Sequence, residues 1–342
     1  MAIITIVGAG DMGSAMSVPA RHNGHEVRLA GTPLDRHIIE QCIKTGVHPS
    51  LKRKLPDGIA FYQAGQLDEA LAGAQLLICG VSSFGVEWFR DEIIPRLPQG
   101  LPVLSVTKGM LDMPDGTLKT FPELYEEAAP GRAFCAIGGP CTSYEMMDGD
   151  QTVVCYCGRD EATLRWMKSL LETPFYHIGV STDVRGLECA VAMKNAYALG
   201  VCLAVGLAQA RDGKQHYNSQ AALFGQSTKE MRRLLALCGG HDDNIIYGVG
   251  DLYVTVFGGR TRKIGTLLGL GLSFDEAMAQ LSGITLESHV IAARTGRALR
   301  RLIESGQANA ADFPLLLHID DIINNGARVD IPWGSFTRSP SP

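Results

Sequence analysis

IITIVGAGDMGSA, at residues 3–15, is the stretch that decides the fold of the first half of the chain. Its β-branched run leads directly into Gly8, Gly10 and Gly13, which have G-x-G-x-x-G spacing. In this motif the first glycine permits a tight turn, and the second lets the backbone approach a pyrophosphate. The third lets a helix pack closely on the strand. The stretch therefore predicts a strand, a turn and a helix that together bind a dinucleotide.

The same motif indicates which residues contact the cofactor. Asp11 and Met12 lie between Gly10 and Gly13, at the start of a helix expected over Asp11–Asn23. Backbone N–H groups at a helix N-terminus stabilise anionic phosphates. The alternative is a glycine turn without a ligand. It is disfavoured because this motif follows a strand and begins a helix.

The end of the second expected strand, His25–Ala30, bears on the choice between NAD and NADP. An Asp or Glu there would bind a ribose 2′-hydroxyl and repel a 2′-phosphate. The chain reads RLAGTP at residues 28–33, with no acid at the strand end. Thr32 and Arg36 are therefore candidates to hold a 2′-phosphate, which favours NADP. The alternative is that Arg36 is a solvated helix residue.

Strands and helices alternate through the first 180 residues. Further expected strands are Gln75–Val81, Leu101–Val106, Ala133–Ile137 and Thr152–Tyr156. The first two are continuous apolar runs, which suit parallel strands covered on both faces. The alternation predicts an α/β Rossmann domain with a doubly wound, mainly parallel sheet over residues 1–182.

The pattern becomes helical after Asp183. Helices are expected at Gly186–Ala210, Leu223–Leu237, Phe274–Leu281 and His289–Glu304. Ser273 and Glu276 form an S-x-x-E capping box at the start of the third of these helices. We therefore expect an all-α domain over residues 183–330, followed by a flexible tail over residues 331–342.

Composition argues against several classes of function. The chain has 342 residues and a net charge of -5, so nothing favours nucleic acid or an anionic membrane as the main partner. The longest apolar run, Ala196–Ala208, is shorter than the ~18 residues that a membrane helix needs, and we see no signal peptide. Nine cysteines lack zinc spacing, so we expect no metal site and a cytoplasmic, reducing location.

Lys194 is the lysine of the apolar run LECAVAMKNAYALG, at residues 187–200. A lysine in such a helix is costly unless it is paired or functional. Reduction of a ketone needs a proton donor at the carbonyl oxygen, and a lysine suits that role. Asp251, in GVGDLYVT, is a candidate to orient the amine. The alternatives are a snorkelling lysine and an acid that caps a turn.

Two further basic segments are candidates for substrate binding. Lys108 follows an expected buried strand in VTKGM, where a doubly wound sheet places its ligands. GGRTRK, at residues 258–263, is glycine-rich and basic, and the guanidinium of Arg260 can bind a phosphate bidentately. A basic surface loop is the alternative for the second segment.

These pieces occur in one order: VGAGDMG, VTKG, GGP, KN in an apolar helix, GDLxxT, and a Gly/Arg loop. Over about residues 3–320, this order resembles the NAD(P)-dependent glycerol-3-phosphate dehydrogenases. The resemblance implies a Rossmann domain, a helical substrate domain and a homodimer. It also implies hydride transfer between NAD(P)H and a small phosphorylated substrate, dihydroxyacetone phosphate or sn-glycerol 3-phosphate.

The resemblance assigns roles by position. Lys194 resembles the family's catalytic lysine, Asp251 the acid that pairs with it, and Lys108 the second active-site lysine. The implied substrate-binding residues are Asn195, Thr255, Arg260 and Thr261. For the cofactor, the resemblance adds Phe84 and Glu287 to the candidates Gly8, Gly10, Asp11, Met12, Gly13, Thr32 and Arg36.

The chain departs from the family pattern at two ligand-binding segments. Gly259-Arg260-Thr261 stands where the family commonly has S-R-N, and Leu286-Glu287-Ser288 stands where it has V-E-G. These changes leave open a related polyol-phosphate or hydroxyacid dehydrogenase, and a cofactor-binding protein without turnover. A nucleotide-sugar dehydrogenase would need a nucleophilic cysteine. Cys189, Cys202 and Cys238 lie in apolar helices, which disfavours that chemistry.

Overall fold

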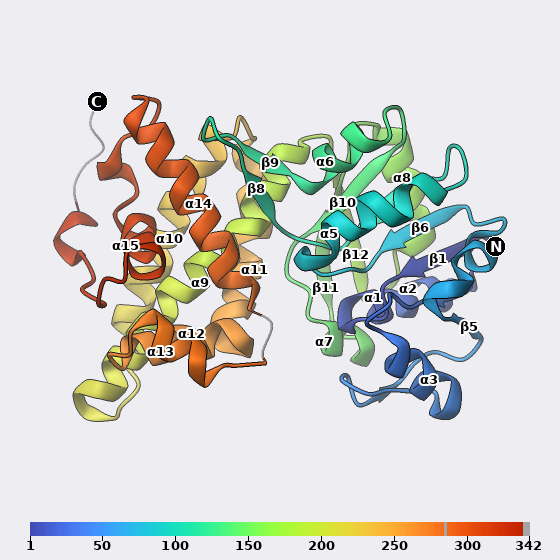
Figure 1. Cartoon of the computed structure of the whole chain (residues 1–342), viewed down its shortest axis with the longest axis horizontal. Helices are drawn as coiled ribbons and strands as arrows, with labels where there is room; N and C mark the ends of the chain where they lie inside the picture. The colour runs from blue at the N-terminus through green and yellow to red at the C-terminus, as the bar shows by residue number, and fades with distance from the viewer. Residues whose placement is uncertain (284–285, 338–342) are drawn as a thin grey trace. The chain divides into compact units, whose positions relative to one another are not determined.

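The chain forms two compact units in a computed structural model that describes residues 1–283 and 286–337 (Figure 1). The first unit comprises Met1–Lys108 and Thr120–Val184. The second comprises Gly109–Lys119 and the chain from Arg185 onward. The main division thus lies two residues beyond the boundary expected from the sequence. Gly109–Lys119, which we expected in the first domain, packs with the second unit.

A mainly parallel eight-stranded sheet forms the core of the first unit, in the order β12-β11-β10-β7-β6-β1-β2-β5. The strands are β1 (Ile3–Val7), β2 (Glu26–Ala30), β5 (Ile59–Tyr62), β6 (Leu76–Cys79), β7 (Val103–Ser105), β10 (Phe134–Gly138), β11 (Thr152–Cys157) and β12 (Tyr176–Ser181). Among the described pairings of this sheet, only β10 with β11 is antiparallel. The strand order reverses between β1 and β6, and sheets of this kind bind ligands at the carboxyl ends beside such a reversal.

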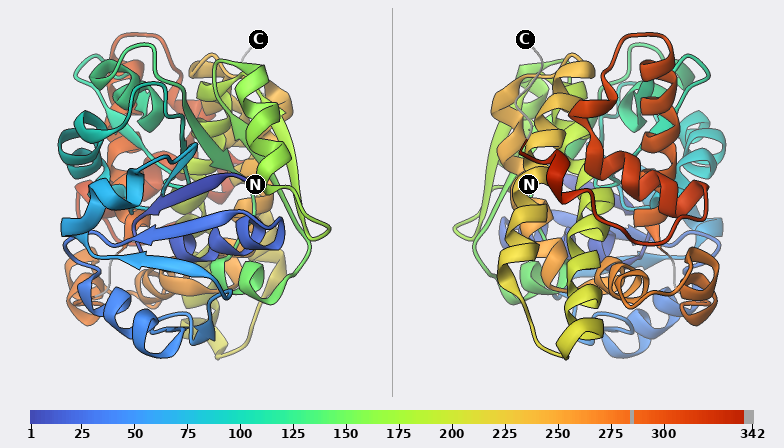
Figure 2. Two further views of the ribbon diagram at one scale, coloured as in Figure 1. Left: turned by 90° about the vertical axis from the view of Figure 1, so that its right-hand side faces the viewer. Right: turned by 90° about the vertical axis from the view of Figure 1, so that its left-hand side faces the viewer.

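Helices cover the sheet of the first unit (Figure 2). They are α1 (Asp11–Ala15), α2 (Ser17–His22), α3 (Arg36–Thr45), α4 (Leu67–Leu71), α5 (Val86–Trp88), α6 (Phe121–Ala128), α7 (Ser143–Asp148) and α8 (Glu161–Leu171). Every residue of β6 is buried, as expected for a strand covered on both faces. The single helix expected over Asp11–Asn23 is divided into α1 and α2. The break occurs because Pro19 has no N–H to donate to the carbonyl of Ala15, where α1 ends.

The second unit is helical, which together with the sheet of the first unit confirms the predicted fold class. Its helices are α9 (Val184–Asp212), α10 (Tyr217–Leu237), α11 (Ile245–Phe257), α12 (Gly259–Gly269), α13 (Phe274–Gln280), α14 (Glu287–Glu304) and α15 (Pro314–Asn324). The capping box of Ser273 and Glu276 at the start of α13 is confirmed. By length and composition α9 resembles a membrane-spanning helix, but 83% of its most apolar 18-residue window is buried inside the protein. It therefore has the properties of a core helix.

Glycines let α9 approach its neighbours backbone to backbone. A Cβ added at Gly269 of α12 would lie 2.2 Å from the carbonyl oxygen of Leu203, and one at Gly206 would lie 2.1 Å from that of Thr266. On α11, a Cβ added at Gly248 would lie 2.5 Å from the carbonyl oxygen of Ala190. Larger residues at these places would force the helices apart. The glycines therefore set the spacing of α9, α11 and α12.

A buried carboxylate joins three helices of the second unit. Glu230 of α10 accepts hydrogen bonds from the backbone N–H groups of Leu315 and Leu316, at the start of α15. It also accepts one from the hydroxyl of Tyr197, on α9. Burial raises the pKa of Glu230 from 4.5 to about 7, because removal from water penalises the charged form.

The tail is anchored where it begins. Ile331 is buried in the hydrophobic core of the second unit, and Trp333–Ser335 form a short 3-10 helix. The rest of the tail that we expected to be flexible, residues 338–342, lies outside the described residues.

Candidate active site

The glycine-rich turn after β1 has the shape that a dinucleotide requires. Gly8 has a φ of +108°, and a Cβ there would lie 2.7 Å from the carbonyl carbon of Gly80, at the end of β6. A Cβ at Gly13 would lie 2.2 Å from the carbonyl oxygen of Gly8. At Gly10, by contrast, no described atom lies within 4 Å of the added Cβ. The turn is thus closed against the sheet and open at Gly10, which suits the approach of a pyrophosphate.

Asp11 and Met12 are the first two residues of α1. In the described part of the chain, no side chain caps this helix at Gly10. Amide groups at an uncapped N-terminus are available to an anion. The turn and the start of α1 therefore fit the cofactor that the sequence predicts.

Sequence reasoning missed two side chains that hold this turn from outside. The carboxylate of Asp35 accepts hydrogen bonds from the amides of Ala9 (3.0 Å) and Thr32 (2.8 Å). The ring of His48, which is fully buried, accepts a hydrogen bond from the amide of Leu51 on Nδ1 and donates from Nε2 to the carbonyl of Ala9 at 2.9 Å. Both backbone groups of Ala9 are therefore fixed. No short motif links residues so far apart, although an Asp near the start of an expected helix was a weak signal for a cap.

The remaining cofactor candidates lie in three places. Thr32 follows β2, and Asp35 holds its amide beside the glycine-rich turn. Arg36 begins α3, exposes 81% of its side chain and pairs with Glu40, so it has the surroundings of a solvated helix residue. Phe84 follows β6 in the short turn Ser83–Gly85 and is 57% exposed. Glu287 is the first residue of α14 and belongs to the second unit.

Lys108 lies just beyond the carboxyl end of β7. Its ammonium Nζ donates to the carbonyl of Gly139 at 2.9 Å, in the turn that follows β10. The hydroxyl of Thr107 donates to the carbonyl of Val81, beyond the end of β6. The VTKG segment after β7 and the GGP segment after β10 are therefore in contact at the carboxyl edge of the sheet, although they are separate motifs in the sequence.

Lys194, Asp251 and Thr255 form a half-buried cluster in the second unit. The ammonium of Lys194 lies 2.8 Å from a carboxylate oxygen of Asp251 and 3.1 Å from the hydroxyl of Thr255. The hydroxyl of Thr255 in turn donates to the backbone carbonyl of Asp251 at 2.7 Å. Asp251 exposes 2% of its side chain and Lys194 exposes 14%. The carboxylate is thus shielded from water, and the ammonium keeps some access.

The close contact of Gly248 with α9 explains why the side chains of Lys194 and Asp251 meet. Gly248 contacts Ala190 of α9, one turn before Lys194, and lies one turn before Asp251 on α11. Side chains one turn apart on a helix share a face. Asp251 and Lys194 therefore both emerge next to the closest approach of the two helices. The sequence signal for this contact is the GVGD stretch, because a glycine one turn before a buried acid permits two helices to approach closely.

The basic segment at residues 258–263 is the first turn of α12, and the expectation of a loop was wrong. Gly258 is the N-cap, and no side chain of the described residues caps the helix there. Arg260 is exposed and Thr261 is buried, both within this first turn. The chain enters this helix through an extended Gly258 and a Gly259 with a φ of +77°, a conformation that glycine adopts without strain. Arg260 therefore lies at a helix N-terminus, whose backbone amide groups favour anions.

Asn195 is half-buried and follows Lys194 on α9.

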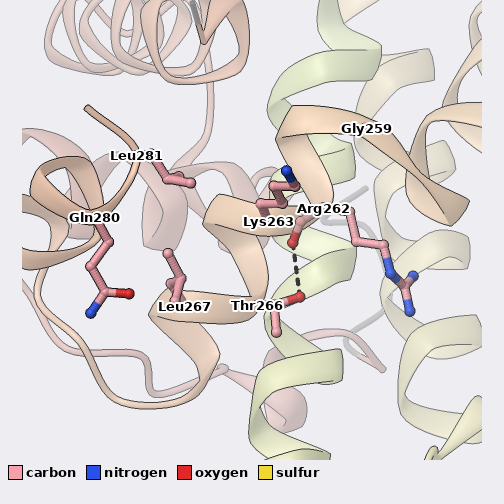
Figure 3. Close-up of a pocket in the computed structure, with 7 residues that line it drawn as sticks. All are labelled: Gly259, Arg262, Lys263, Thr266, Leu267, Gln280 and Leu281. Atoms are coloured by element: carbon pink, nitrogen blue, oxygen red, sulfur yellow. Dashed lines mark hydrogen bonds between the residues drawn. The ribbon is translucent and has the colours of Figure 1, made fainter. Parts of the chain in front are cut away.

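A pocket of about 510 Å³ lies between α12 and α13 (Figure 3). It is lined by Gly259, Arg262, Lys263, Thr266, Leu267, Gln280 and Leu281. Figure 3 shows Arg262 pointing away from the two leucines, and its guanidinium donates to the carbonyl of Val256 at 2.7 Å. Gly259, in the first turn of α12, borders this pocket.

All nine cysteines are present as thiols. Burial raises the pKa of Cys202 to about 12, so its reactive thiolate is scarce at neutral pH. The described part of the chain also holds no group of three or more His, Cys, Asp or Glu side chains suited to a metal ion.

Comparisons with known proteins match both halves of the chain. The profile of the NAD-dependent glycerol-3-phosphate dehydrogenase N-terminus matches residues 3–164, and the profile of the corresponding C-terminus matches residues 183–332. The NADP(+)-dependent glycerol-3-phosphate dehydrogenase of Archaeoglobus fulgidus is 33% identical over 334 residues, which cover 96% of this chain and 97% of that protein.

A second relative and a solved structure agree with these matches. The glycerol-3-phosphate dehydrogenase [NAD(P)+] of Koribacter versatilis is 28% identical over 295 residues, 84% of each chain. The crystal structure of the glycerol-3-phosphate dehydrogenase of Coxiella burnetii superposes with a TM-score of 0.80 at 21% identity, covering 98% of this chain and 97% of that one. The last similarity shows that the fold is shared.

Proposed function

Because the chain belongs to the NAD-dependent glycerol-3-phosphate dehydrogenase family, we propose that it interconverts dihydroxyacetone phosphate and sn-glycerol 3-phosphate with NAD(P)H or NAD(P)+. The observation that carries the proposal is the buried pair of Lys194 and Asp251, with 2.8 Å between the ammonium and the carboxylate. A ketone reduction needs one positioned proton donor, and this pair supplies it.

Lys194 is the proton donor of the proposed reaction. The reduced cofactor, when bound at the glycine-rich turn, would supply a hydride to the carbonyl carbon. The ammonium of Lys194 gives a proton to the carbonyl oxygen, and the two transfers together convert the ketone to the alcohol. Asp251 holds the ammonium in place, and the hydroxyl of Thr255 accepts a second hydrogen bond from it. In the reverse direction, the neutral amine takes the proton back.

The phosphate end of the substrate is held by α12. Arg260 and Thr261 lie in its first turn, beside amides that no described side chain caps, and a guanidinium and such amides both favour an anion. Binding energy from a phosphate remote from the reacting carbon orients the carbonyl for transfer. Asn195, beside Lys194, and Lys108 complete the proposed substrate contacts by hydrogen bonding to the carbonyl end.

NADP is the preferred cofactor in this proposal. The end of β2 carries no acid that would repel a 2′-phosphate. The carboxylate of Asp35, five residues on, is instead engaged by the amides of Ala9 and Thr32. The hydroxyl of Thr32 and the exposed guanidinium of Arg36 are the proposed contacts of the 2′-phosphate, and Phe84 and Glu287 are further proposed cofactor contacts. The relative from Archaeoglobus fulgidus is named as NADP(+)-dependent, which supports the same preference.

The proposal includes a homodimer in the reducing cytoplasm. Tyr253 and Phe257 each expose 58% of their surface, and their rings stack edge to face at 4.8 Å on α11. Exposed aromatic pairs of this kind are enriched at protein interfaces. Nine thiols in one chain suit a reducing compartment. Sedimentation velocity tests the dimer: a single species with the mass of one chain at micromolar concentration would refute it.

The proposed reaction is tested by following absorbance at 340 nm with purified protein, NADPH or NADH, and a panel of phosphorylated ketoses. We expect the fastest oxidation with dihydroxyacetone phosphate and NADPH. A faster reaction with a longer ketose phosphate would assign the change at Thr261 to a different substrate. Bound cofactor that no panel member oxidises would refute the proposed function.

A further inference from the structure

The chain passes from the first unit to the second directly after Lys108. Lys108 is the last residue of a first-unit segment, and Gly109, bonded directly to it, belongs to the second unit. The residues that follow form a hairpin of two strands, β8 (Met110–Asp112) and β9 (Leu118–Thr120). The chain then re-enters the first unit at Thr120, whose hydroxyl caps α6. Lys108 is therefore tethered by its own backbone to the unit that carries Lys194.

The hairpin is built into the second unit. Met110 and Leu118 are buried in its hydrophobic core. Gly116, at the tip, has a φ of +88°, and a Cβ there would lie 3.2 Å from the carbonyl oxygen of Ala298 on α14. The tip therefore sits close against the backbone of that helix, in agreement with the position of β8 and β9 beside α14 in Figure 1.

Three arginines on one face of α14 hold the hairpin. Arg294 donates to the carbonyl of Met110, and Arg301 donates to the carbonyl of Met113 at 2.7 Å. Between them, Arg297 binds the carboxylate of Asp112 bidentately, at 3.0 and 3.1 Å. The residues are three and four positions apart, so they share one helix face. We call Arg294, Arg297, Arg301 and Asp112 the arginine clamp.

Asp112 is the central member of the clamp. It exposes 13% of its side chain, and Arg301 adds a second cation at 3.6 Å. Arg297 itself exposes 45% of its side chain, but a bidentate pair whose carboxylate is half-buried resists solvent screening better than a fully exposed pair. Asp112 is also close to Lys108 in the sequence, because it lies only four residues beyond that lysine.

We propose that the arginine clamp is a positioning device for Lys108, and that Asp112 acts on the reaction through that lysine. The clamp fixes β8 in the second unit, and β8 fixes Gly109 and the backbone of Lys108. The backbone at Lys108 is thereby anchored to the unit that holds Lys194. This inference rests on the proposed function, because it takes both lysines to act on one substrate.

The test is a double-mutant cycle between Asp112→Ala and Lys108→Ala, with kcat, the KM of dihydroxyacetone phosphate, the Kd of NADPH from fluorescence quenching, and Tm as readouts. Asp242→Ala is the matched control, because it removes another bidentate Arg–Asp pair of the second unit, Arg232 with Asp242, far along the chain from the hairpin. We expect Asp112→Ala to lower kcat about 10-fold, since small misplacements of a reacting group are costly. The Kd of NADPH should stay within about twofold, because the glycine-rich turn is untouched.

The cycle separates the clamp from the proposed function. We expect Asp112→Ala to change kcat by less than about twofold when Lys108 is already Ala, because coupled residues are not additive. An equal loss in both backgrounds, or the same loss in Asp242→Ala, overturns the clamp and leaves the proposed function standing. Wild-type kcat in Lys108→Ala overturns the role of Lys108 and the clamp together. If Asp112→Ala lowers Tm, assays well below that Tm must still show the loss of kcat.

Discussion

Replacing Gly248 by alanine tests how the Lys194–Asp251 pair is built. The added Cβ would lie 2.5 Å from the carbonyl oxygen of Ala190, whereas ordinary contacts begin near 3.4 Å. The helices α9 and α11 must therefore separate by about 0.9 Å at this point. Asp251 lies one turn beyond Gly248, so its 2.8 Å contact with Lys194 lengthens by a similar amount.

A displacement of this size has a large expected effect on the reaction. A misplacement of about 1 Å can cost about 100-fold in rate, so we expect kcat to fall by about 10- to 100-fold in Gly248→Ala. Overpacking should also lower the free energy of unfolding by about 1–3 kcal/mol. The cofactor turn is in the other unit, so the Kd of NADPH should not change. Steady-state assays at 340 nm and chemical denaturation measure these quantities.

Gly225→Ala is the matched control for this substitution. Gly225 also lies within a helix of the second unit, but no described atom lies within 4 Å of an added Cβ. This variant should keep wild-type kcat. A folded Gly248→Ala protein with wild-type kcat would refute the claim that close approach of α11 to α9 sets the catalytic pair. Equal losses in both variants would do the same.

Three further predictions concern the cofactor turn, the proton donor and a buried acid. Asp35→Ala removes the acceptor shared by the amides of Ala9 and Thr32, so the Kd of NADPH in fluorescence titrations should rise about 10-fold; an unchanged Kd would show that the turn holds its shape alone. Thr255→Val removes one acceptor of the Lys194 ammonium and should lower kcat about 5-fold at constant Kd of NADPH, whereas unaltered kcat would remove Thr255 from the mechanism. The raised pKa of Glu230, about 7 against 4.5, means that the folded chain keeps a proton that the unfolded chain releases between these pH values. Its contribution to stability is therefore lost as pH rises through this window, by about 3 kcal/mol, and Glu230→Gln should flatten that dependence in urea titrations; an unchanged slope would contradict the assignment.

Local patterns were sufficient to predict much of the fold. The run from Ile3 to Gly13 predicted a strand, a closed turn and a helix start, because each glycine is required by the local backbone geometry. The apolar run around Leu76–Cys79 predicted a fully covered strand, and its residues are all buried. Pro19 was a missed signal, since its absent N–H divides the expected helix at Ala15.

Long-range contacts explain what the sequence alone did not predict. Met110–Thr120 reads as a short turn-rich segment, and nothing local shows that it packs with a helix that begins at Glu287. Asp35 and His48 hold the glycine-rich turn across tens of residues, so only the folded chain reveals them. The meeting of Lys194 with Asp251 depends on Gly248 touching Ala190, a contact between two helices far apart in the sequence.

The most direct measurement of the central claim is a single turnover with bound cofactor. Wild-type protein and Lys194→Met are each saturated with NADPH, mixed rapidly with dihydroxyacetone phosphate, and followed at 340 nm. Lys214→Met, which removes an exposed lysine of the second unit just after α9, controls for the loss of a positive charge. We predict that Lys194→Met binds NADPH normally but oxidises it at least about 1,000-fold more slowly than the wild-type protein, while Lys214→Met retains most of the rate. Oxidation by Lys194→Met at the wild-type rate would contradict the assignment of Lys194 as the proton donor.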